Sequence, residues 1–332
     1  MEKTQKKAQA RDFIGGGSAL NKDAELICSE IKKVIIGKNE TIEKVLMAIL
    51  AGGHVLIEDV PGVGKTTLAL AFSKVLGLDG RRIQFTPDTV ASDITGYSAY
   101  DREANGFVYR PGAVMTNILL ADEINRTSGK TQSALLEVME EGACTVDGIT
   151  HEVPKPFSVL ATQNPVGSAG TSMLPASQLD RFIIKLSMGY PDKESMKNIL
   201  KDRHHENPLD NAKTVSNAES LIKMQKKAAE TFVDESVYDY ISELAEETRK
   251  SEYVTLGVSP RGALALCRMA KAKAFCSGRE YAVPQDVRDL FTDVFAHRLV
   301  LSTKAKICEI SAENVLNGII ESVKCPENRY GK

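Results

Sequence analysis

The apolar positions divide the chain into two parts. Up to about residue 190, short apolar runs alternate with stretches in which apolar residues recur every three or four positions. Short apolar runs predict buried strands, and the wider spacing predicts amphipathic helices. Strands that alternate with helices predict an α/β fold with a parallel sheet covered on both faces. The expected strands are Val55 to Ile57, Ile83 to Phe85, Asn117 to Leu120, Phe157 to Thr162 and Phe182 to Leu186.

Four apolar stripes predict helices before and between these strands. They are Ile27, Ile31 and Val34; Ile42, Val45, Leu46 and Ile49; Leu68, Phe72 and Val75; and Leu135, Val138 and Met139. The last helix should stop near Gly142, because glycine accepts the left-handed backbone that commonly ends a helix. Between the first two stripes, Ile35 to Gly37 form a short apolar turn. Lining of a base pocket and plain core packing are both open for this turn.

Two longer excursions interrupt the alternation. Residues 89 to 113 carry aromatic side chains around Asn105-Gly106, and residues 143 to 155 carry Asp147-Gly148. Asn-Gly and Asp-Gly favour hairpin turns because both residues accept positive φ. Each excursion is longer than a simple connection requires. Such length is typical of functional segments, and neutral decoration of the surface is the alternative.

From about Pro191 the strand pattern ends and only helical patterns follow. They are Met196 to Leu200; Val237, Ile241 and Leu244; Leu264, Cys267, Arg268 and Ala272; and Val287, Leu290, Val294 and Leu299. This part is predicted to be a separate all-helical domain. The polar start of the chain contains Gly15 to Ser18, which is typical of a flexible tail. We therefore expect a tail (1–22), an α/β domain (23–190) and a helical domain (191–332).

Composition narrows the class of protein. The 332 residues are 42% hydrophobic and 26% charged with a formal net charge of −2, which is ordinary for a globular protein and gives no global nucleic-acid footprint. A local basic surface stays open. The six scattered cysteines lack a Cys-x-x-Cys pair, so we expect reduced thiols in the cytoplasm. No apolar run approaches the roughly 18 residues of a membrane span, and Met1 to Asp12 lack the apolar core of a secretory signal.

The stretch from Val55 to Thr67 carries the clearest chemistry. An apolar strand, a Pro/Gly turn, Lys-Thr and a helix in that order predict a phosphate-binding loop. Its glycines let successive N–H groups face one concavity, and the N-terminus of the following helix adds its positive end. Lys65 is expected to contact the terminal phosphates and the Thr66 hydroxyl to hold Mg²⁺. The predicted loop comprises Gly62, Val63, Gly64, Lys65, Thr66 and Thr67. Asp59 stands where the usual motif has glycine, and we expect it to change the entrance of the turn without abolishing phosphate binding.

A second apolar strand runs into two acids, Asp122 and Glu123. A strand end beside the loop would bring Asp122 to Mg²⁺ and let Glu123 polarise the water that attacks the γ-phosphate. Asn164 closes the next strand, where an amide can orient that water or contact the γ-phosphate. Arg181 precedes the last strand and Arg261 opens a helix of the second part. Taken singly, each arginine is also compatible with an ordinary surface salt bridge.

Together these motifs resemble an AAA+ ATPase and, more narrowly, the MoxR family. The general motifs are Gly62 to Thr66, Leu120 to Glu123, Asn164, Leu179 to Phe182 and Ser259 to Arg261. The narrower resemblance rests on Glu58 to Thr66, Gln84 to Asp88, Ala121 to Arg126, Ala161 to Pro165 and His297 to Val300. It covers about residues 25 to 325.

The resemblance implies a large α/β nucleotide domain followed by a small helical lid, with ATP and Mg²⁺ bound. It makes Asn164 the first sensor and Arg261 the second, which touches the nucleotide from the lid. It makes Arg181 the arginine finger that reaches the neighbouring subunit's site, so the active form should be a ring, usually a hexamer. Arg126 would be a further interface residue. The two predicted hairpins would match inserts that face the pore of the ring.

The resemblance also implies a class of function. MoxR-like ATPases act as chaperones, often with proteins that carry a von Willebrand factor A domain, and assist maturation or metal and cofactor insertion. We therefore expect ATP hydrolysis coupled to remodelling of a protein client. A nucleic-acid translocating motor is the first alternative, and the near-neutral charge argues against it. A low-turnover, nucleotide-gated scaffold is the second, and the presence of Glu123 argues against it.

Overall fold

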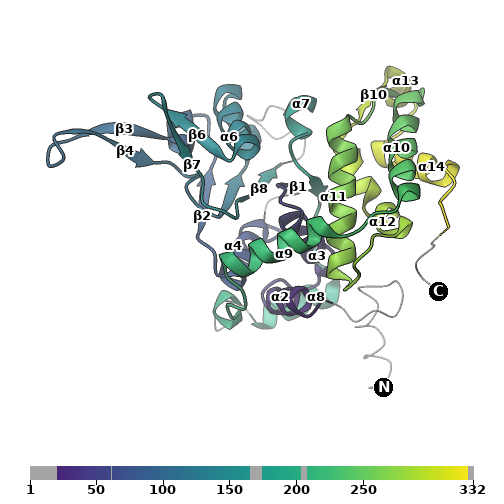
Figure 1. The fold of residues 1–332 in the computed structure, drawn as a ribbon, viewed down its shortest axis with the longest axis horizontal. Helices are drawn as coiled ribbons and strands as arrows, with labels where there is room; N and C mark the ends of the chain where they lie inside the picture. The colour runs from purple at the N-terminus through teal and green to yellow at the C-terminus, as the bar shows by residue number, and fades with distance from the viewer. Residues whose placement is uncertain (1–20, 61, 165–173, 203–207, 328–332) are drawn as a thin grey trace.

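The computed structural model describes residues 21–60, 62–164, 174–202 and 208–327. The predicted tail therefore lies almost wholly outside the described residues, as do Pro61 and Pro165 of the motifs. Figure 1 shows a sheet flanked by helices, with two hairpins projecting from one end and a group of helices packed at the other. Among the described residues, none of the helices combines the length and the apolar character needed to cross a membrane. All six cysteines are free.

A five-stranded parallel sheet forms the centre of the first part. Its order is β2–β5–β8–β1–β9, and all neighbours are parallel. The strands are β1 (Val55–Glu58), β2 (Gly80–Gln84), β5 (Ile118–Asp122), β8 (Ser158–Gln163) and β9 (Ile184–Leu186). The predicted parallel sheet is confirmed, with strand boundaries that differ from the predicted ones by up to three residues. The expected α/β fold class is therefore correct.

Helices cover both faces of this sheet. They are α2 (Lys22–Lys32), α3 (Asn39–Leu50), α4 (Lys65–Leu76), α5 (Ala91–Thr95), η1 (Ile124–Arg126), α6 (Gly129–Glu141) and α7 (Ala176–Leu179). Successive residues of β1 face opposite sides, as the pleat of a strand requires. Val55 and Ile57 pack in the core under α2, α3 and α4, whereas Leu56 packs in the core under α6. The predicted stop of α6 is also present, because Gly142 caps it with φ 65°.

Both predicted hairpins are present. They consist of β3 (Gly96–Asp101) with β4 (Gly106–Pro111) and β6 (Ala143–Val146) with β7 (Ile149–Glu152). Asp147-Gly148 forms the two-residue turn of the second hairpin, with φ 50° and 78°, as expected for a turn of type I′. The first hairpin has a longer turn, because Asp101 pairs with Gly106 and four residues separate them. Both hairpins project on the side of the sheet away from the second part (Figure 1).

The second part is helical apart from one short strand pair. Its helices are α8 (Lys193–Asp202), η2 (Pro208–Asn211), α9 (Ala218–Glu230), α10 (Glu235–Lys250), α11 (Pro260–Cys276), α12 (Pro284–Phe295), η3 (Ala296–Arg298), α13 (Thr303–Ile307) and α14 (Ala312–Ser322). The antiparallel pair of β10 (Val254–Leu256) and β11 (Val300–Leu301) corrects the expectation of an all-helical domain. Strands of two and three residues are too short to show a period in the sequence.

The predicted apolar stripe of α11 was only partly correct, because Ala272 is buried and Cys267 packs against the core but the other two positions are not buried. Leu264 is 65% exposed, and Arg268 is also exposed. The buried face instead carries Ala265, Leu266 and Met269, where α11 packs against α9 and α12. Apolar residues occupy both sides of this helix, and the face that packs closely uses alanine, which a search for large apolar residues underweights.

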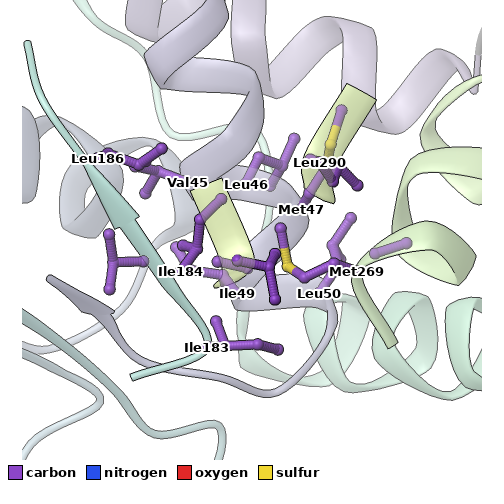
Figure 2. Close-up of a cluster of buried hydrophobic side chains, with 14 of the residues drawn as sticks. Val45, Leu46, Met47, Ile49, Leu50, Ile183, Ile184, Leu186, Met269 and Leu290 are labelled. Carbon is purple, nitrogen blue, oxygen red and sulfur yellow. The ribbon is translucent and has the colours of Figure 1, made fainter. Parts of the chain in front are cut away.

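One hydrophobic cluster joins the two parts of the chain. Leu46 of α3 and Ile184 of β9 lie in the same buried cluster as Met269 of α11 and Leu290 of α12. Figure 2 shows these side chains converging where the edge strand β9 meets α3 and the helices of the second part. The helical part is therefore docked on the sheet by a continuous apolar core, and this docking decides where Arg261 lies.

Candidate active site

The carboxyl ends of the parallel strands bring the predicted loop and acids together. The loop follows β1 and leads into α4, while Asp122 ends β5 and Asn164 follows β8. Because β5, β8 and β1 are adjacent and parallel, these ends meet at one edge of the sheet, as in other open α/β sheets. We call this the loop edge. The edge where the strands begin is called the opposite edge.

The loop has the backbone expected for phosphate binding. Gly62 and Gly64 have φ of 84° and 96°, and a Cβ built on either would meet no atom within 4 Å. Both glycines are therefore needed for backbone conformation, and the loop opens onto free space. Lys65 begins α4 and donates through Nζ to the carbonyl oxygen of Asp59 over 2.8 Å. Burial lowers the pKa of Lys65, while the charges of Asp59, Asp122 and Glu123 oppose that shift.

Asp59 ties the entrance of the loop to the end of β9. Its Oδ2 accepts hydrogen bonds from the amides of Met188 at 2.6 Å and Gly189 at 2.5 Å, and from the Ser187 hydroxyl at 3.1 Å. Its Oδ1 accepts from the Val60 amide at 2.8 Å. A buried carboxylate is stabilised by several such donors. Asp59 therefore fixes the chain where it leaves the sheet towards the second part.

Asp122 is held by partners from two neighbouring strands. Its Oδ1 accepts from the Thr162 hydroxyl at 2.6 Å, and its Oδ2 accepts from Arg82 Nη2 at 2.8 Å. Arg82 lies on β2 and also donates to Gln84 at 2.6 Å. The sequence analysis assigned no role to either residue: Thr162 lies inside the motif Ala161 to Pro165, but only Asn164 was singled out there, and Arg82 belongs to none of the motifs. In the register of β2 with β5, Gln84 pairs with Asp122, and Arg82 lies two residues earlier on the same face of the sheet.

Glu123 lies in a left-handed conformation immediately after β5, with φ 58°. Its Oε2 accepts from Arg126 Nη1 at 2.8 Å and from Gln84 Nε2 at 3.0 Å. Its Oε1 accepts from Asn164 Nδ2 at 2.9 Å. The hydrogen bond from Arg126, followed by that from Asn164, holds the pKa of Glu123 below its usual value, against the effect of burial. Glu123 is therefore ionised at neutral pH, and its carboxylate lies within hydrogen-bonding distance of the Asn164 amide.

Arg181 lies at the opposite edge of the sheet. It precedes β9, whereas the loop edge lies at the far ends of β1, β5 and β8, which have four to six residues and span roughly 13–20 Å. Its Nη1 donates to the Leu136 carbonyl at 2.5 Å and lies 3.3 Å from Glu140 Oε2. Arg181 therefore does not reach the phosphate loop of its own chain.

Arg261 lies beside Arg181. It is the second residue of α11 and forms an ion pair with Oε1 of the same Glu140. Since α6 follows β5 and returns across the sheet, its last turn and Glu140 lie at the opposite edge. The structure thus places Arg261 away from its own phosphate loop, whereas the resemblance implied contact with the nucleotide from the lid. Glu140 had no signal in the sequence analysis.

The loop edge fits a nucleoside triphosphate with a divalent cation. Gly64 has no side chain to cap α4, so the first amides of that helix are left for a ligand. Lys65 supplies positive charge, and the Thr66 hydroxyl and the Asp122 carboxylate are oxygen ligands of the kind that Mg²⁺ prefers. Among the described residues, no group of three or more His, Cys, Asp or Glu side chains could hold a metal by itself. A cation here would need phosphate oxygens as further ligands.

Comparison with known proteins also indicates an ATPase. Residues 54–184 match the model described as "ATPase family associated with various cellular activities (AAA)", and residues 246–319 match the AAA lid domain. The chain is 47% identical to the uncharacterized protein YeaC of Bacillus subtilis, over 90% of this chain and 93% of that one. It is 41% identical to Chaperone MoxR1 of Mycobacterium tuberculosis, over 90% and 81%. A solved structure of a candidate ATPase from Cytophaga hutchinsonii superposes with a TM-score of 0.86 at 35% identity, over 92% of this chain and 95% of that one.

Proposed function

This chain belongs to the MoxR family of AAA+ ATPases, and we propose that it hydrolyses ATP at sites shared between neighbouring subunits of a ring to remodel a protein client. The observation that carries the proposal is the separation of two sets of residues. The groups that bind phosphate lie at the loop edge, whereas Arg181 and Arg261 lie together at the opposite edge. One copy of the chain therefore offers each half of a site to a different neighbour.

In the proposed site, residues 62–67 bind the phosphates of ATP. The backbone amides of the loop and the Lys65 ammonium hold the phosphate oxygens, which draws Lys65 away from the Asp59 carbonyl. Thr66 and Asp122 would hold Mg²⁺, which neutralises charge on the phosphates when bound. Arg82 has to release Asp122 for this to happen. These exchanges replace contacts within the chain by contacts with the substrate.

Glu123 accepts the proton of the attacking water. Its lowered pKa keeps the carboxylate ionised, and Asn164 orients the carboxylate and the water. Arg126 and Gln84 occupy the other carboxylate oxygen in the present conformation. Glu123 has to leave these two partners before it can act as a base, because a carboxylate that is fully hydrogen-bonded is a weak acceptor.

In the proposed ring, the neighbouring subunit supplies further positive charge to the phosphates bound at the loop edge. Arg181 and Arg261 of one subunit would approach the γ-phosphate at the loop edge of the next, as an arginine finger does. We propose a hexamer, with residues 191–332 as the lid. The location of Arg261 beside Arg181 leads us to assign it to the neighbour's nucleotide.

The two hairpins are the proposed contacts with the client. Tyr97, Tyr100 and Phe107 of the first hairpin are 55%, 57% and 78% exposed, and Ile149 of the second is 63% exposed. Both hairpins project from the same side of the molecule (Figure 1). Exposed aromatic side chains suit transient contact with protein.

By analogy with relatives named as chaperones, we propose a role in maturation or in metal or cofactor insertion, with a von Willebrand factor A domain partner. We place this activity in the cytoplasm because all six cysteines are free.

The test measures ATP turnover per subunit against protein concentration, with molecular mass determined in the same buffers with and without ATP and Mg²⁺. Turnover that rises as a species of about six subunits forms would support shared sites. A constant turnover from a monomer would overturn the ring mechanism and leave a self-contained nucleotide switch.

A further inference from the structure

We propose that Arg298 is a positioning residue for ATP hydrolysis: with Asp180 and Ser259 it forms a joint that fixes Arg181 and Arg261 side by side for the neighbouring subunit. The inference rests on the proposed function, in which both arginines serve the next subunit's nucleotide. It concerns the His297 to Val300 motif, which no step of the proposed reaction uses. We call Arg298, Asp180 and Ser259 the arginine joint.

Arg298 binds the chain on both sides of Arg181. Its Nε donates to Asp180 Oδ1 at 2.8 Å, and its Nη2 donates to the Phe182 carbonyl at 2.6 Å. The neighbouring His297 contacts the same Phe182 carbonyl through Nε2 at 3.0 Å. The residues before and after Arg181 are therefore both anchored to the second part of the chain. The backbone of Arg181 has little freedom to move separately.

Ser259 links the same carboxylate to the helix that carries Arg261. Its hydroxyl donates to Asp180 Oδ2 at 2.8 Å and accepts from the Gly262 amide at 3.2 Å, as the N-cap of α11. Arg298 and Ser259 thus occupy one oxygen each of Asp180. Since Arg261 lies two residues after Ser259, the single Asp180 carboxylate sets the spacing between the two arginines.

Polar contacts hold the arginine joint together. A cavity of about 390 Å³ borders it, lined among others by Asp180, Val258, Ser259 and Arg298. The side chain of Arg298 is only 2% exposed, and a buried guanidinium is stable only while its partners are present. Asp180 and the carbonyl oxygens are those partners. Loss of any of them therefore leaves a buried charge without its partner and loosens the joint.

Gly262 makes room for Arg298. A Cβ built on Gly262 would lie 2.7 Å from Cδ of Arg298 and 2.6 Å from Cγ1 of Val258. Gly262→Ala therefore displaces Arg298 without removing a charge or a hydrogen-bonding group. This substitution probes the joint independently of Arg298→Gln and Asp180→Asn.

The experiment mixes two kinds of subunit that are each impaired in a different half of the site. Glu123→Gln subunits lack the base and keep both arginines, whereas joint variants keep the phosphate loop and the base. Arg298→Gln, Asp180→Asn and Gly262→Ala alone should each lower turnover about tenfold, since a misplacement of about 1 Å is costly in catalysis. Mixed one to one with Glu123→Gln, each should recover to about fivefold above the mean of the two preparations, because half of the intact loops then meet correctly held arginines.

Recovery on mixing distinguishes positioning from support of the fold. A joint variant that is only misfolded would have a defective loop of its own and would gain nothing from a Glu123→Gln neighbour. Absence of recovery in all three variants, with ring size and melting temperature unchanged, would overturn the proposal. Arg249→Gln is the matched control. Arg249 lines the same cavity but donates to the Val258 carbonyl, so its turnover should stay within about twofold, as for most surface substitutions.

Arg181→Ala mixed with Glu123→Gln tests the premise separately. This pair must also recover if the sites are shared between subunits. Failure of the Arg181→Ala mixture would reject the proposed ring mechanism. Recovery of Arg181→Ala without recovery of the joint variants would reject only the role of Arg298.

Discussion

The two edges of the central sheet carry opposite halves of one reaction. The loop edge has two carboxylates, a lysine and free amides, whereas the opposite edge has Arg181 and Arg261 around Glu140. In each half, the functional charges are paired within the chain. Glu123 is bound by Arg126 at the loop edge, as the two arginines are bound by Glu140 at the other.

The pairing of charges at each edge shows which contacts have to be exchanged when subunits assemble around a nucleotide. In a single subunit, Glu123 is paired with Arg126, and Glu140 is paired with both arginines of the opposite edge. The pairs at the opposite edge are partly exposed, with 31%, 46% and 36% exposure for Arg181, Arg261 and Glu140. Exposed pairs contribute little to stability, so exchanging Glu140 for a nucleotide phosphate costs little. The predictions below test whether the two edges are halves of one site.

The largest effect is expected from the opposite edge. Arg181→Ala should lower turnover about 10³-fold in the ring, because a finger arginine stabilises charge that develops in the transition state. ATP affinity of the subunit should change by less than about twofold. Steady-state turnover and nucleotide binding measure the two quantities. Arg81→Ala, another half-exposed arginine, is the control, and a wild-type rate for Arg181→Ala would contradict the comparison.

The loop edge should show a smaller loss with a different signature. Glu123→Gln removes the base and should lower turnover about 10²-fold while ATP stays bound. Lys65→Ala should instead weaken ATP binding, since it removes a phosphate contact. Retention of labelled ATP on a filter, measured beside turnover, separates these variants. If Glu123→Gln turns over normally, Glu123 is not the base.

A third test concerns the stability of the opposite edge. His54 accepts from the Val159 amide through Nδ1 and contacts the Met139 carbonyl through Nε2, which joins β1 to β8 and α6. Burial lowers the pKa of His54 to about 4. The unfolded state therefore binds the extra proton below pH 6.5, and stability falls as pH decreases from about 6.5 towards 4. Between pH 7 and pH 5, His54 alone should lower the free energy of unfolding by about 1–2 kcal/mol.

Chemical denaturation at pH 7 and pH 5 measures this loss. His297 is buried beside Arg298 and also has a pKa well below its usual value, so it adds to the same slope. His54→Gln retains an acceptor and a donor and removes the titration, so it should flatten the pH dependence. An equally steep slope in His54→Gln would show that other groups are responsible.

The smallest effect is expected from the residue that holds the arginines in the free subunit. Glu140→Gln weakens both ion pairs and should lower the protein concentration needed for ATP-dependent assembly by about two- to fivefold. Light scattering against concentration measures the midpoint. Glu141→Gln, the exposed neighbour, is the matched control. A higher midpoint in Glu140→Gln would mean that Glu140 stabilises the assembled ring.

The sequence predicted those features that local pattern and parallel topology determine together. Strand, turn and helix around Lys65 are encoded in consecutive residues, and parallel pairing then brings Asp122, Glu123 and Asn164 to the same edge. Partners that depend on distant contacts were not predicted. Arg82 reaches Asp122 only through the pairing of β2 with β5, and Glu140 meets Arg261 across 121 residues.

The position of Arg261 shows most clearly what the sequence pattern could not predict. The motif Ser259 to Arg261 marks a helix start, but the direction of that helix depends on how the second part docks on β9. This docking rests on Met269 and Leu290 in the shared core and on the bond from Ser259 to Asp180. The periodicity marked Leu290 as a buried position, but it gave no information on which segments these residues contact.

The hydrogen bonds to Asp59 offer a way to follow nucleotide binding by experiment. The amides of Met188 and Gly189 are hydrogen-bonded to a side chain at the entrance of the phosphate loop. Their rates of hydrogen–deuterium exchange therefore depend on whether Asp59 keeps its place when Lys65 turns from the Asp59 carbonyl towards a phosphate. We therefore expect this pair of backbone amides outside the loop to report, without an attached probe, when that loop is filled.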